Sequence, residues 1–251
     1  MAGRGHFNHR EVEDTGPDVL NLIGTMSEGA VTSLQVFFLT LIFSMPLALP
    51  ITFGRMSKNR PLRAVVSFYI LIMRGTPLIL QIIFIYFAPK YLLMFLNETL
   101  GGRINSQAFW GTVRFVLSYD RFTAAIIAFA LNYAAYFAEI YRGGIESIPR
   151  GQYEAAKVLG FTRSQTFMRI VLPQMVKRIL PAAGNEVITL VKDTALAQVI
   201  GVLELFHVAR TASAREFSTT PIFVAGLFYL FMNWVVTVVF ANCEKKLAYY
   251  S

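Results

Sequence analysis

Residues 151–173 read "GQYEAAKVLGFTRSQTFMRIVLP", a polar and strongly patterned segment between two apolar stretches of the chain. It carries too many charged and polar residues to cross a bilayer, because a span needs about 20 mostly apolar residues. Its regular pattern is nevertheless that of folded structure. We therefore expect an ordered polar element that lies outside the bilayer between two spans.

The segment predicts two short helices set at an angle, the first projecting from the membrane. Its two consecutive alanines are strong helix formers, and Gly160 suits the left-handed position that comes after a helix. Thr162 and Gln165 have the spacing of a capping box at the start of the second helix. Pro173 and Pro181 are expected to break or kink the chain beyond that helix.

The rest of the chain has the composition of a membrane protein. Of its 251 residues 55% are hydrophobic, and the mean hydropathy is +0.51, which soluble domains of this length rarely reach. The single cysteine excludes an internal disulfide, and the three dispersed histidines give no metal-ligand spacing, so we expect no metal. A net charge of +8 in such a chain is typical of basic cytoplasmic loops rather than of nucleic-acid binding.

Five stretches are long and apolar enough to span a bilayer. They are residues 30–54, 64–88, 122–141, 179–205 and 221–242, of which the fourth is the most polar. Residues 1–20 form a polar N-terminal tail, and the longest segments between spans are 89–121 and 142–178. The sequence thus predicts an all-α integral membrane protein with five transmembrane helices, in which residues 1–251 form a single domain.

The basic residues are distributed unevenly between the two sides of the membrane. The loop after the first span carries four basic residues and no acid, and the loop after the third carries seven against two acids. Lys245 and Lys246 come after the last span, whereas the opposite side is nearly balanced in charge. The positive-inside rule therefore places the N-terminus outside, and the C-terminus and residues 151–173 in the cytoplasm.

Arg74 is expected near the middle of the second span. Gly75 and Pro77 come directly after it, so the helix is predicted to kink or break there. Broken helices at this depth are found where they line a cavity. The guanidinium group is also a planar fork that fits a carboxylate.

Polar residues share faces of the third and fourth predicted spans, because their spacings match the helical repeat. The residues in the third span are Asn132, Tyr136 and Glu139. Those in the fourth are Asn185, Thr189 and Lys192, with Glu186 and Asp193 on the adjacent strip. Gln81 lies seven residues after Arg74, which would give it the same face in an unbroken helix.

Two interpretations of these groups remain open. In the first they neutralise one another, Glu139 with Arg142 and Lys192 with a nearby acid. In the second, Arg74 and an acid such as Glu139 or Glu186 bind a small zwitterion, the cation taking its carboxylate and the acid its amine. The acids in the two spans slightly favour a substrate with an additional positive charge.

The stretch "EAAKVLGFTRSQTFMRIVLP" resembles the EAA loop of the permease subunits of bacterial ABC importers. That pattern is Glu-Ala-Ala, three residues, Gly, nine residues, Ile, one residue and Leu-Pro, and all seven positions match. The stretches "RGTPLILQ", "YFAEIYRGGIESIPRGQYEAA" and "KDTALAQVIG" are similar to the polar amino acid branch of these permeases, which also includes opine systems. Ala195 stands where Ser is more usual in that branch.

The resemblance implies that the first short helix is a coupling helix, seated in a groove of an ATPase subunit. The predicted coupling residues are Gly151, Glu154, Ala155, Ala156, Gly160 and Pro173. The predicted substrate-pathway residues are Arg74, Thr76, Gln81, Asn132, Tyr136, Glu139, Asn185, Glu186, Thr189, Lys192 and Asp193.

The resemblance also implies a set of partners in a bacterial plasma membrane. These are a second permease subunit, identical or paralogous, two ATPase subunits, an extracytoplasmic binding protein and a polar amino acid, basic by the slight preference above. The chain has no GxxxxGK[ST] loop, so ATP and Mg are expected on the ATPase subunits and no cofactor on this chain.

Three alternatives stand beside this interpretation. One is an importer of opines or other amino-acid derivatives. Another is a transporter driven by an ion gradient through Glu139, Glu186 and Asp193. The last is an intramembrane enzyme, which the sequence disfavours because it has no Ser/His/Asp order, CxxC or HExxH.

Overall fold

The computed structural model describes residues 19–100, 107, 110–113 and 118–248, and the regular elements assigned within these residues are helices. Residues 1–18 of the predicted tail lie outside the described residues. The elements are α1 (Val19–Arg55), α2 (Arg60–Gly75), α3 (Leu78–Leu100), α5 (Arg121–Glu146), α6 (Arg150–Val158), α7 (Arg163–Thr166), the π-helical η1 (Phe167–Val171), α8 (Leu172–Asp193), the 3₁₀-helical η2 (Thr194–Ile200), α9 (Leu205–Glu216) and α10 (Thr220–Ala248).

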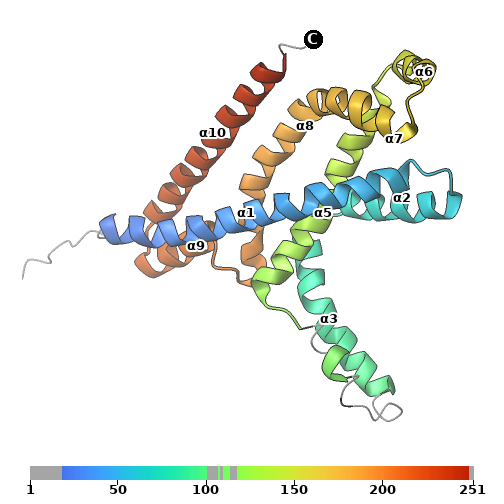
Figure 1. Ribbon diagram of the computed structural model, residues 1–251. Coiled ribbons are helices and arrows are strands. Elements are labelled where there is room, and N and C mark those ends of the chain that lie inside the picture. Colours follow the sequence, from blue (N-terminus) through green and yellow to red (C-terminus); the bar gives the residue numbers. More distant parts are fainter. Residues whose placement is uncertain (1–18, 101–106, 108–109, 114–117, 249–251) are drawn as a thin grey trace, which may run out of the picture.

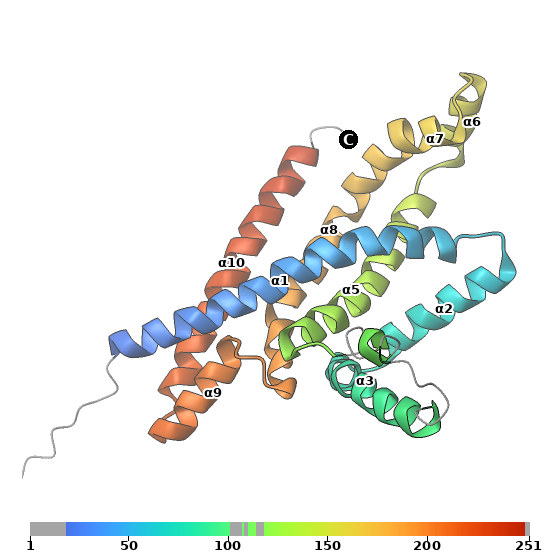
Figure 2. The same ribbon diagram turned by 60° about the horizontal axis from the view of Figure 1, so that its bottom comes forward.

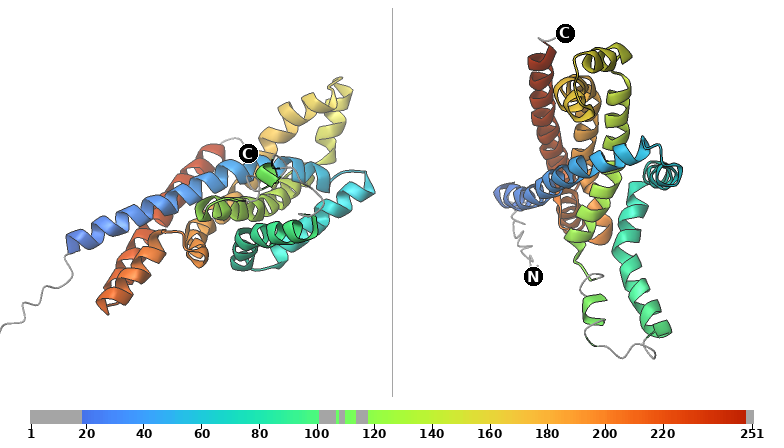
Figure 3. Two further views of the ribbon diagram at one scale, coloured as in Figure 1. Left: turned by 90° about the horizontal axis from the view of Figure 1, so that it is seen from below. Right: turned by 45° about the vertical axis from the view of Figure 1, so that its right-hand side comes forward.

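The helices pack around α5, which contacts α1, α2, α3 and α8 (Figure 1). α1 crosses α5 as a long rod, and α2 turns back from its end (Figure 2). α8 and α10 lie side by side. α6 and the C-terminal end of α10 lie at one end of the molecule, whereas the far end of α3 lies at the other (Figures 1 and 3).

Small residues allow α1 to approach α5 closely. Thr40, Ser44, Ala48 and Thr52 recur every four residues along α1 and are fully buried or nearly so. The Thr52 hydroxyl donates to the Ala138 carbonyl of α5 at 3.1 Å, so this is the face that meets α5. On the alanine-rich side of α5 little side-chain bulk separates the two backbones, which is the usual packing of helices in membranes.

Four helices of the described residues are long and apolar enough to cross a membrane, over Asn21–Arg55, Leu78–Leu100, Arg121–Glu146 and Thr220–Lys246. The predicted second span, 64–88, is divided between α2 and α3, and the predicted break after Arg74 is confirmed. α2 ends at Gly75, Thr76 is extended (φ −120°, ψ 149°), and α3 begins at Leu78. α3 then continues to Leu100, into the region expected to be a loop.

The fourth predicted span, 179–205, also differs from the structure. The α-helix begins at Leu172 and ends at Asp193, after which η2 leads to Gly201 in the left-handed conformation (φ +79°). The chain does not break at Pro173 or Pro181, because α7, η1 and α8 run on as one helical stretch through both residues. Pro173 has no N–H to donate, and η1 accommodates it with a wider turn in which the N–H of Leu172 donates to the Phe167 carbonyl.

Candidate functional site

The two predicted short helices begin with α6 and α7, and the predicted signals at the end of α6 and at the start of α7 are confirmed. Gly160 is left-handed (φ +76°), the Phe161 N–H donates to the Ala156 carbonyl, and the Gly160 N–H donates to the Lys157 carbonyl, which together form a Schellman motif. Thr162 and Gln165 form the predicted capping box, with reciprocal bonds of 3.3 and 2.9 Å. Both ends of the turn between α6 and α7 are therefore fixed.

α6 projects from the helical bundle (Figure 1), contacts η1 and has Ala156 as its buried residue. Of the predicted coupling residues, Gly151, Glu154, Ala155 and Gly160 are exposed, whereas Ala156 is fully buried. The sequence analysis did not single out Val158 and Leu159, which are 88% and 71% exposed at the end of α6. Exposed apolar side chains next to small residues form a surface suited to another protein.

The base of α6 is tied to α8. Arg178 on α8 donates to the Ser147 carbonyl in the turn between α5 and α6. Gln174 donates to the Gln152 side chain of α6 at 3.3 Å. Pro173, the remaining predicted coupling residue, lies in the first turn of α8 just before this contact. α6 and the turn before it are therefore linked to the start of α8 by side-chain hydrogen bonds.

Three predicted pathway residues stabilise the break between α2 and α3. The Gln81 amide donates to the carbonyls of Met73 (3.0 Å) and Thr76 (3.1 Å) and to the Thr76 hydroxyl (2.8 Å). Asn132 of α5 donates to Met73 O (2.8 Å) and to Gln81 Oε1 (2.9 Å). The expectation that Gln81 shares a face with Arg74 is wrong, because the chain is extended at Thr76 between them.

Glu139 lies at the junction of three helices and is surrounded by arginines. Its carboxylate accepts from Arg142 at 2.7 and 3.1 Å, lies 3.5 Å from Arg55 Nε of α1 and lies 4.0 Å from Arg74 Nη1 of α2. Arg142 also binds Glu146 at 2.5 Å. The predicted pair of Glu139 with Arg142 is confirmed, and three guanidinium groups against two carboxylates leave the cluster with one net positive charge.

Arg74 is the least firmly bound cation of this cluster. Its side chain is 44% exposed, its guanidinium carbon lies 5.1 Å from the centre of the Tyr136 ring, and it is within electrostatic reach of Glu186 on α8. Arg74, Glu139 and Gly75 line an open pocket of about 340 Å³. Four predicted pathway residues, Arg74, Tyr136, Glu139 and Glu186, are therefore gathered in one region.

The predicted polar face of α8 is exposed. Asn185, Thr189 and Lys192 are all exposed, and the Thr189 hydroxyl donates to the Asn185 carbonyl at 2.9 Å. The expected pairing of Lys192 with an acid is absent from the described part of the chain. Asp193 instead accepts a hydrogen bond from the Tyr133 hydroxyl of α5 at 2.7 Å.

Glu204 is a buried acid that sequence reasoning missed. It is fully buried and accepts from the N–H groups of Phe206 (2.8 Å) and His207 (2.7 Å) and from the Tyr229 hydroxyl (2.9 Å). It caps the N-terminus of α9 and ties that helix to α10. No local pattern marks it, because Glu is not among the preferred N-cap residues and Tyr229 is distant in the sequence.

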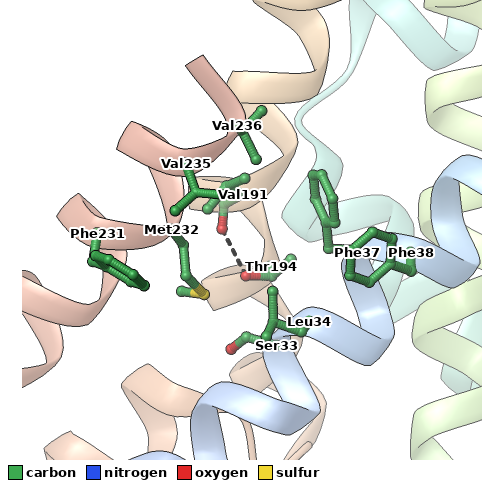
Figure 4. A pocket seen from close by; sticks show the side chains of 10 residues that line it. All are labelled: Ser33, Leu34, Phe37, Phe38, Val191, Thr194, Phe231, Met232, Val235 and Val236. Atoms are coloured by element: carbon green, nitrogen blue, oxygen red, sulfur yellow. Dashed lines mark hydrogen bonds between the residues drawn. The ribbon is translucent and has the colours of Figure 1, made fainter. Parts of the chain in front are cut away.

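A second cavity, of about 180 Å³, lies between α1, α8 and α10 (Figure 4). It is lined by apolar side chains such as Phe37, Met232 and Val235, with two hydroxyl-bearing residues, Ser33 and Thr194. The Thr194 hydroxyl is engaged with the Val191 carbonyl at 2.7 Å. The cavity therefore offers too few polar partners for a charged solute.

Comparison with known proteins gives a consistent result. Residues 33–249 match the family described as binding-protein-dependent transport system inner membrane component. The chain is 36% identical over 207 residues to the nopaline transport system permease protein NocM of Agrobacterium fabrum, covering 82% of this chain and 80% of that protein. It is 38% identical over 211 residues to the L-cystine transport system permease protein TcyB of Bacillus subtilis, covering 84% and 80%.

A solved structure extends this likeness to three dimensions. The crystal structure of an amino acid ABC transporter with histidines superposes with a TM-score of 0.74 at 30% identity, over 91% of this chain and 96% of that one. The chain therefore belongs to the family of inner membrane components of binding-protein-dependent transport systems.

Proposed function

We propose that this chain is the permease subunit of an ATP-driven importer that moves a polar amino acid across the plasma membrane. The observation that carries the proposal is α6, a rigid helix with the EAA pattern that projects from the bundle of a family member. In this proposal ATP is hydrolysed by two separate ATPase subunits, and the solute arrives from an extracytoplasmic binding protein.

The proposed topology has five crossings, formed by α1, by α2 with α3, by α5, by α8 and by α10. An odd number of crossings places the two termini on opposite sides. Lys245 and Lys246 lie at the end of α10, on the same side of the molecule as α6. These basic residues and those around α6 support a cytoplasmic position for that end, with the N-terminus outside.

The proposed coupling runs from α6 into the membrane. α6 is tied to α8 through Gln174 and Arg178, and α7, η1 and α8 form one helical run that ends at Asp193. When the ATPase subunits close on ATP, a movement of α6 would tilt α8 as a body, and with it Glu186. A rigid element with two positions is sufficient for such a switch.

The proposed substrate pathway passes the Arg74 region. The net positive charge of the arginine cluster and the exposed fork of Arg74 suit a carboxylate, and Glu186 is available for an amine. The slight preference for a basic substrate loses its support, since Glu139 is already bound by arginines and Asp193 by Tyr133. The proposal is therefore a polar α-amino acid recognised through its common groups.

The exposed polar face of α8 supports a second subunit. Asn185, Thr189 and Lys192 would be costly against lipid. We place this face toward the pathway between two permease subunits, identical or paralogous.

An opine importer is the second candidate, because NocM is a nopaline system permease and is as similar to this chain as an amino acid permease is. Opines carry the same α-amino-acid-like carboxylate and amine groups, so the Arg74 region would suit both. The ligand bound by the partner binding protein separates these candidates.

The test is uptake by proteoliposomes that contain this chain with its partner subunits. Radiolabelled arginine, glutamine, cystine and nopaline are offered with the binding protein outside and ATP inside, or with an imposed proton or sodium gradient and no ATP. The proposal predicts uptake of one of these solutes that requires both ATP and the binding protein. Uptake by this chain alone under an ion gradient would contradict it and support an ion-coupled transporter.

A further inference from the structure

A large pocket lies beneath α6, and its lining includes none of the charged residues of the arginine cluster. Its volume is about 710 Å³, within the range of specific ligand sites, and its walls come from the ends of α1 and α5 and from α6, α7 and η1. Phe53 of α1 and Phe167 of η1 form an edge-to-face pair in its wall, with ring centres 5.6 Å apart. None of the predicted coupling or pathway residues lines it.

The pocket has an apolar part and a cationic part. Phe53, Met56 and Phe167 supply apolar walls, whereas Lys157 and Arg163 supply two positive charges. Neither cation forms an ion pair with another described residue, and the lining among these residues includes no acid. A ligand that fits both parts is an anion with an attached hydrocarbon chain.

The apolar part continues into an exposed apolar stripe along α1. Ile42, Leu49, Phe53 and Met56 are all exposed large apolar residues, and their spacings of seven, four and three place them on one face of the helix. This stripe runs along the span and ends in the pocket. A hydrocarbon chain from the bilayer can therefore extend along α1 into the pocket without crossing a polar surface.

We infer that this pocket binds an anionic phospholipid of the inner leaflet, with its acyl chain along the α1 stripe and its phosphate between Lys157 and Arg163. The inference rests on the proposed cytoplasmic position of α6. Basic pockets at the cytoplasmic ends of transmembrane helices are suited to anionic headgroups. Tyr153 of α6 also lines the pocket, and its hydroxyl is a further donor for the headgroup.

The bound lipid would complete the support of the coupling helix. Ala156 is the buried residue of α6, and Tyr153 and Lys157, one turn apart, line the pocket. A lipid in the pocket would therefore fill the space between α6 and the ends of α1 and α5. Glu154 and Ala155 lie outside the pocket lining and stay available for the ATPase.

The test is lipid retention by the purified complex of this chain with its partner subunits. The complex is incorporated into nanodiscs of phosphatidylcholine with phosphatidylglycerol, and the lipids that remain bound are counted by native mass spectrometry. The double variant Lys157→Gln/Arg163→Gln removes both cations. Arg150→Gln/Arg169→Gln is the matched control, because it removes two exposed cations of the same segment that do not line the pocket.

The wild type and the control are expected to retain phosphatidylglycerol over phosphatidylcholine, and the Lys157/Arg163 variant to bind it about 30-fold more weakly. A photoreactive phosphatidylglycerol should cross-link the wild type at Phe53, Tyr153 or Phe167, which keeps the test independent of how the variant folds. Equal retention of the two lipids by the wild type, equal loss in both double variants, or cross-linking of the photoreactive lipid only at residues outside this pocket would overturn the inference.

Lipid retention and transport are separate readouts. A complex that retains phosphatidylglycerol at this pocket but imports no amino acid would contradict the proposed function alone. A complex that imports an amino acid with ATP but retains no phosphatidylglycerol here would contradict the lipid site alone.

Discussion

Arg74 Nη1 lies 4.0 Å from a Glu139 carboxylate oxygen, the same oxygen that Arg142 binds at 2.7 Å. Arg74 is thus at the limit of an ion pair, while Arg142 holds the carboxylate closely. The guanidinium group of Arg74 lies over the ring of Tyr136, and the Arg74 side chain remains partly exposed. A ligand carboxylate can therefore form an ion pair with Arg74 while Glu139 stays paired with Arg142, so no charge is left unpaired in a poorly solvated site.

Replacing Arg74 tests the carboxylate site. Arg74→Ala removes the fork, and we expect amino acid uptake to fall by at least about 10- to 100-fold, since a charged hydrogen bond contributes roughly 1.5–3 kcal/mol. Arg74→Lys keeps the charge but loses the bidentate geometry, so its uptake should lie between that of the wild type and that of Arg74→Ala. Initial uptake rates in proteoliposomes measure both. Arg169→Ala, an exposed arginine outside the cluster, is the control, and normal uptake by Arg74→Ala would exclude the site.

Asn132→Leu is expected to destabilise the fold. The substitution removes the bonds that Asn132 donates to Met73 O and to Gln81 Oε1. Met73 O still accepts from Gln81 Nε2, whereas the buried Gln81 Oε1 loses this donor at a cost of about 1–3 kcal/mol. The melting temperature in detergent should fall by about 2–4 °C for each kcal/mol. Asn185→Leu makes the same change at an exposed position of α8 and should leave the melting temperature unchanged. Equal melting temperatures of Asn132→Leu and Asn185→Leu would contradict the claim that Asn132 stabilises the break between α2 and α3.

Gly144→Ala tests the contact between α5 and α8 beneath the projecting helix. A Cβ at Gly144 would lie 2.3 Å from Ile179 Cγ2 and 2.9 Å from Met175 Cγ, so the two helices would have to shift. Overpacking of this kind costs about 1–3 kcal/mol. We expect a lower melting temperature and weaker stimulation of ATP hydrolysis. Gly143→Ala meets nothing within 4 Å and should behave as the wild type, so similar losses in both variants would count against this packing.

The elements that the sequence predicted well depend on local chemistry. The left-handed Gly160, the capping box of Thr162 with Gln165 and the break after Arg74 each arise from residues within a few positions of one another. The pair of Glu139 with Arg142 is likewise three residues apart on one helix. Such signals can be read directly from spacing, because the backbone geometry that connects them is known.

The features that could not be predicted depend on distant partners. Asp193 pairs with Tyr133 rather than with Lys192, and Glu204 is held by Tyr229, in each case through contacts between helices far apart in the sequence. The roles of Gln81 and Asn132 depend on the carbonyl of Met73, a backbone group that every residue carries and no pattern marks. The boundaries of the second and fourth predicted spans were drawn from apolar composition alone. The helices in these regions begin and end at other residues, because the backbone conformation changes at Thr76 and after Asp193.

The central claim is that α6 connects this chain to an ATPase, and Ala155→Arg tests it most directly. Ala155 is exposed on α6. A large charged side chain at this position should therefore leave the permease folded but prevent α6 from binding in the groove of the ATPase subunit. Ala214→Arg is the matched control, because Ala214 is exposed on α9, at a distance from α6. The measurement is co-purification of the ATPase subunits together with the ATP hydrolysis that the binding protein stimulates. The account predicts that both are lost in Ala155→Arg and retained in Ala214→Arg, whereas full retention of both by a folded Ala155→Arg variant would contradict it.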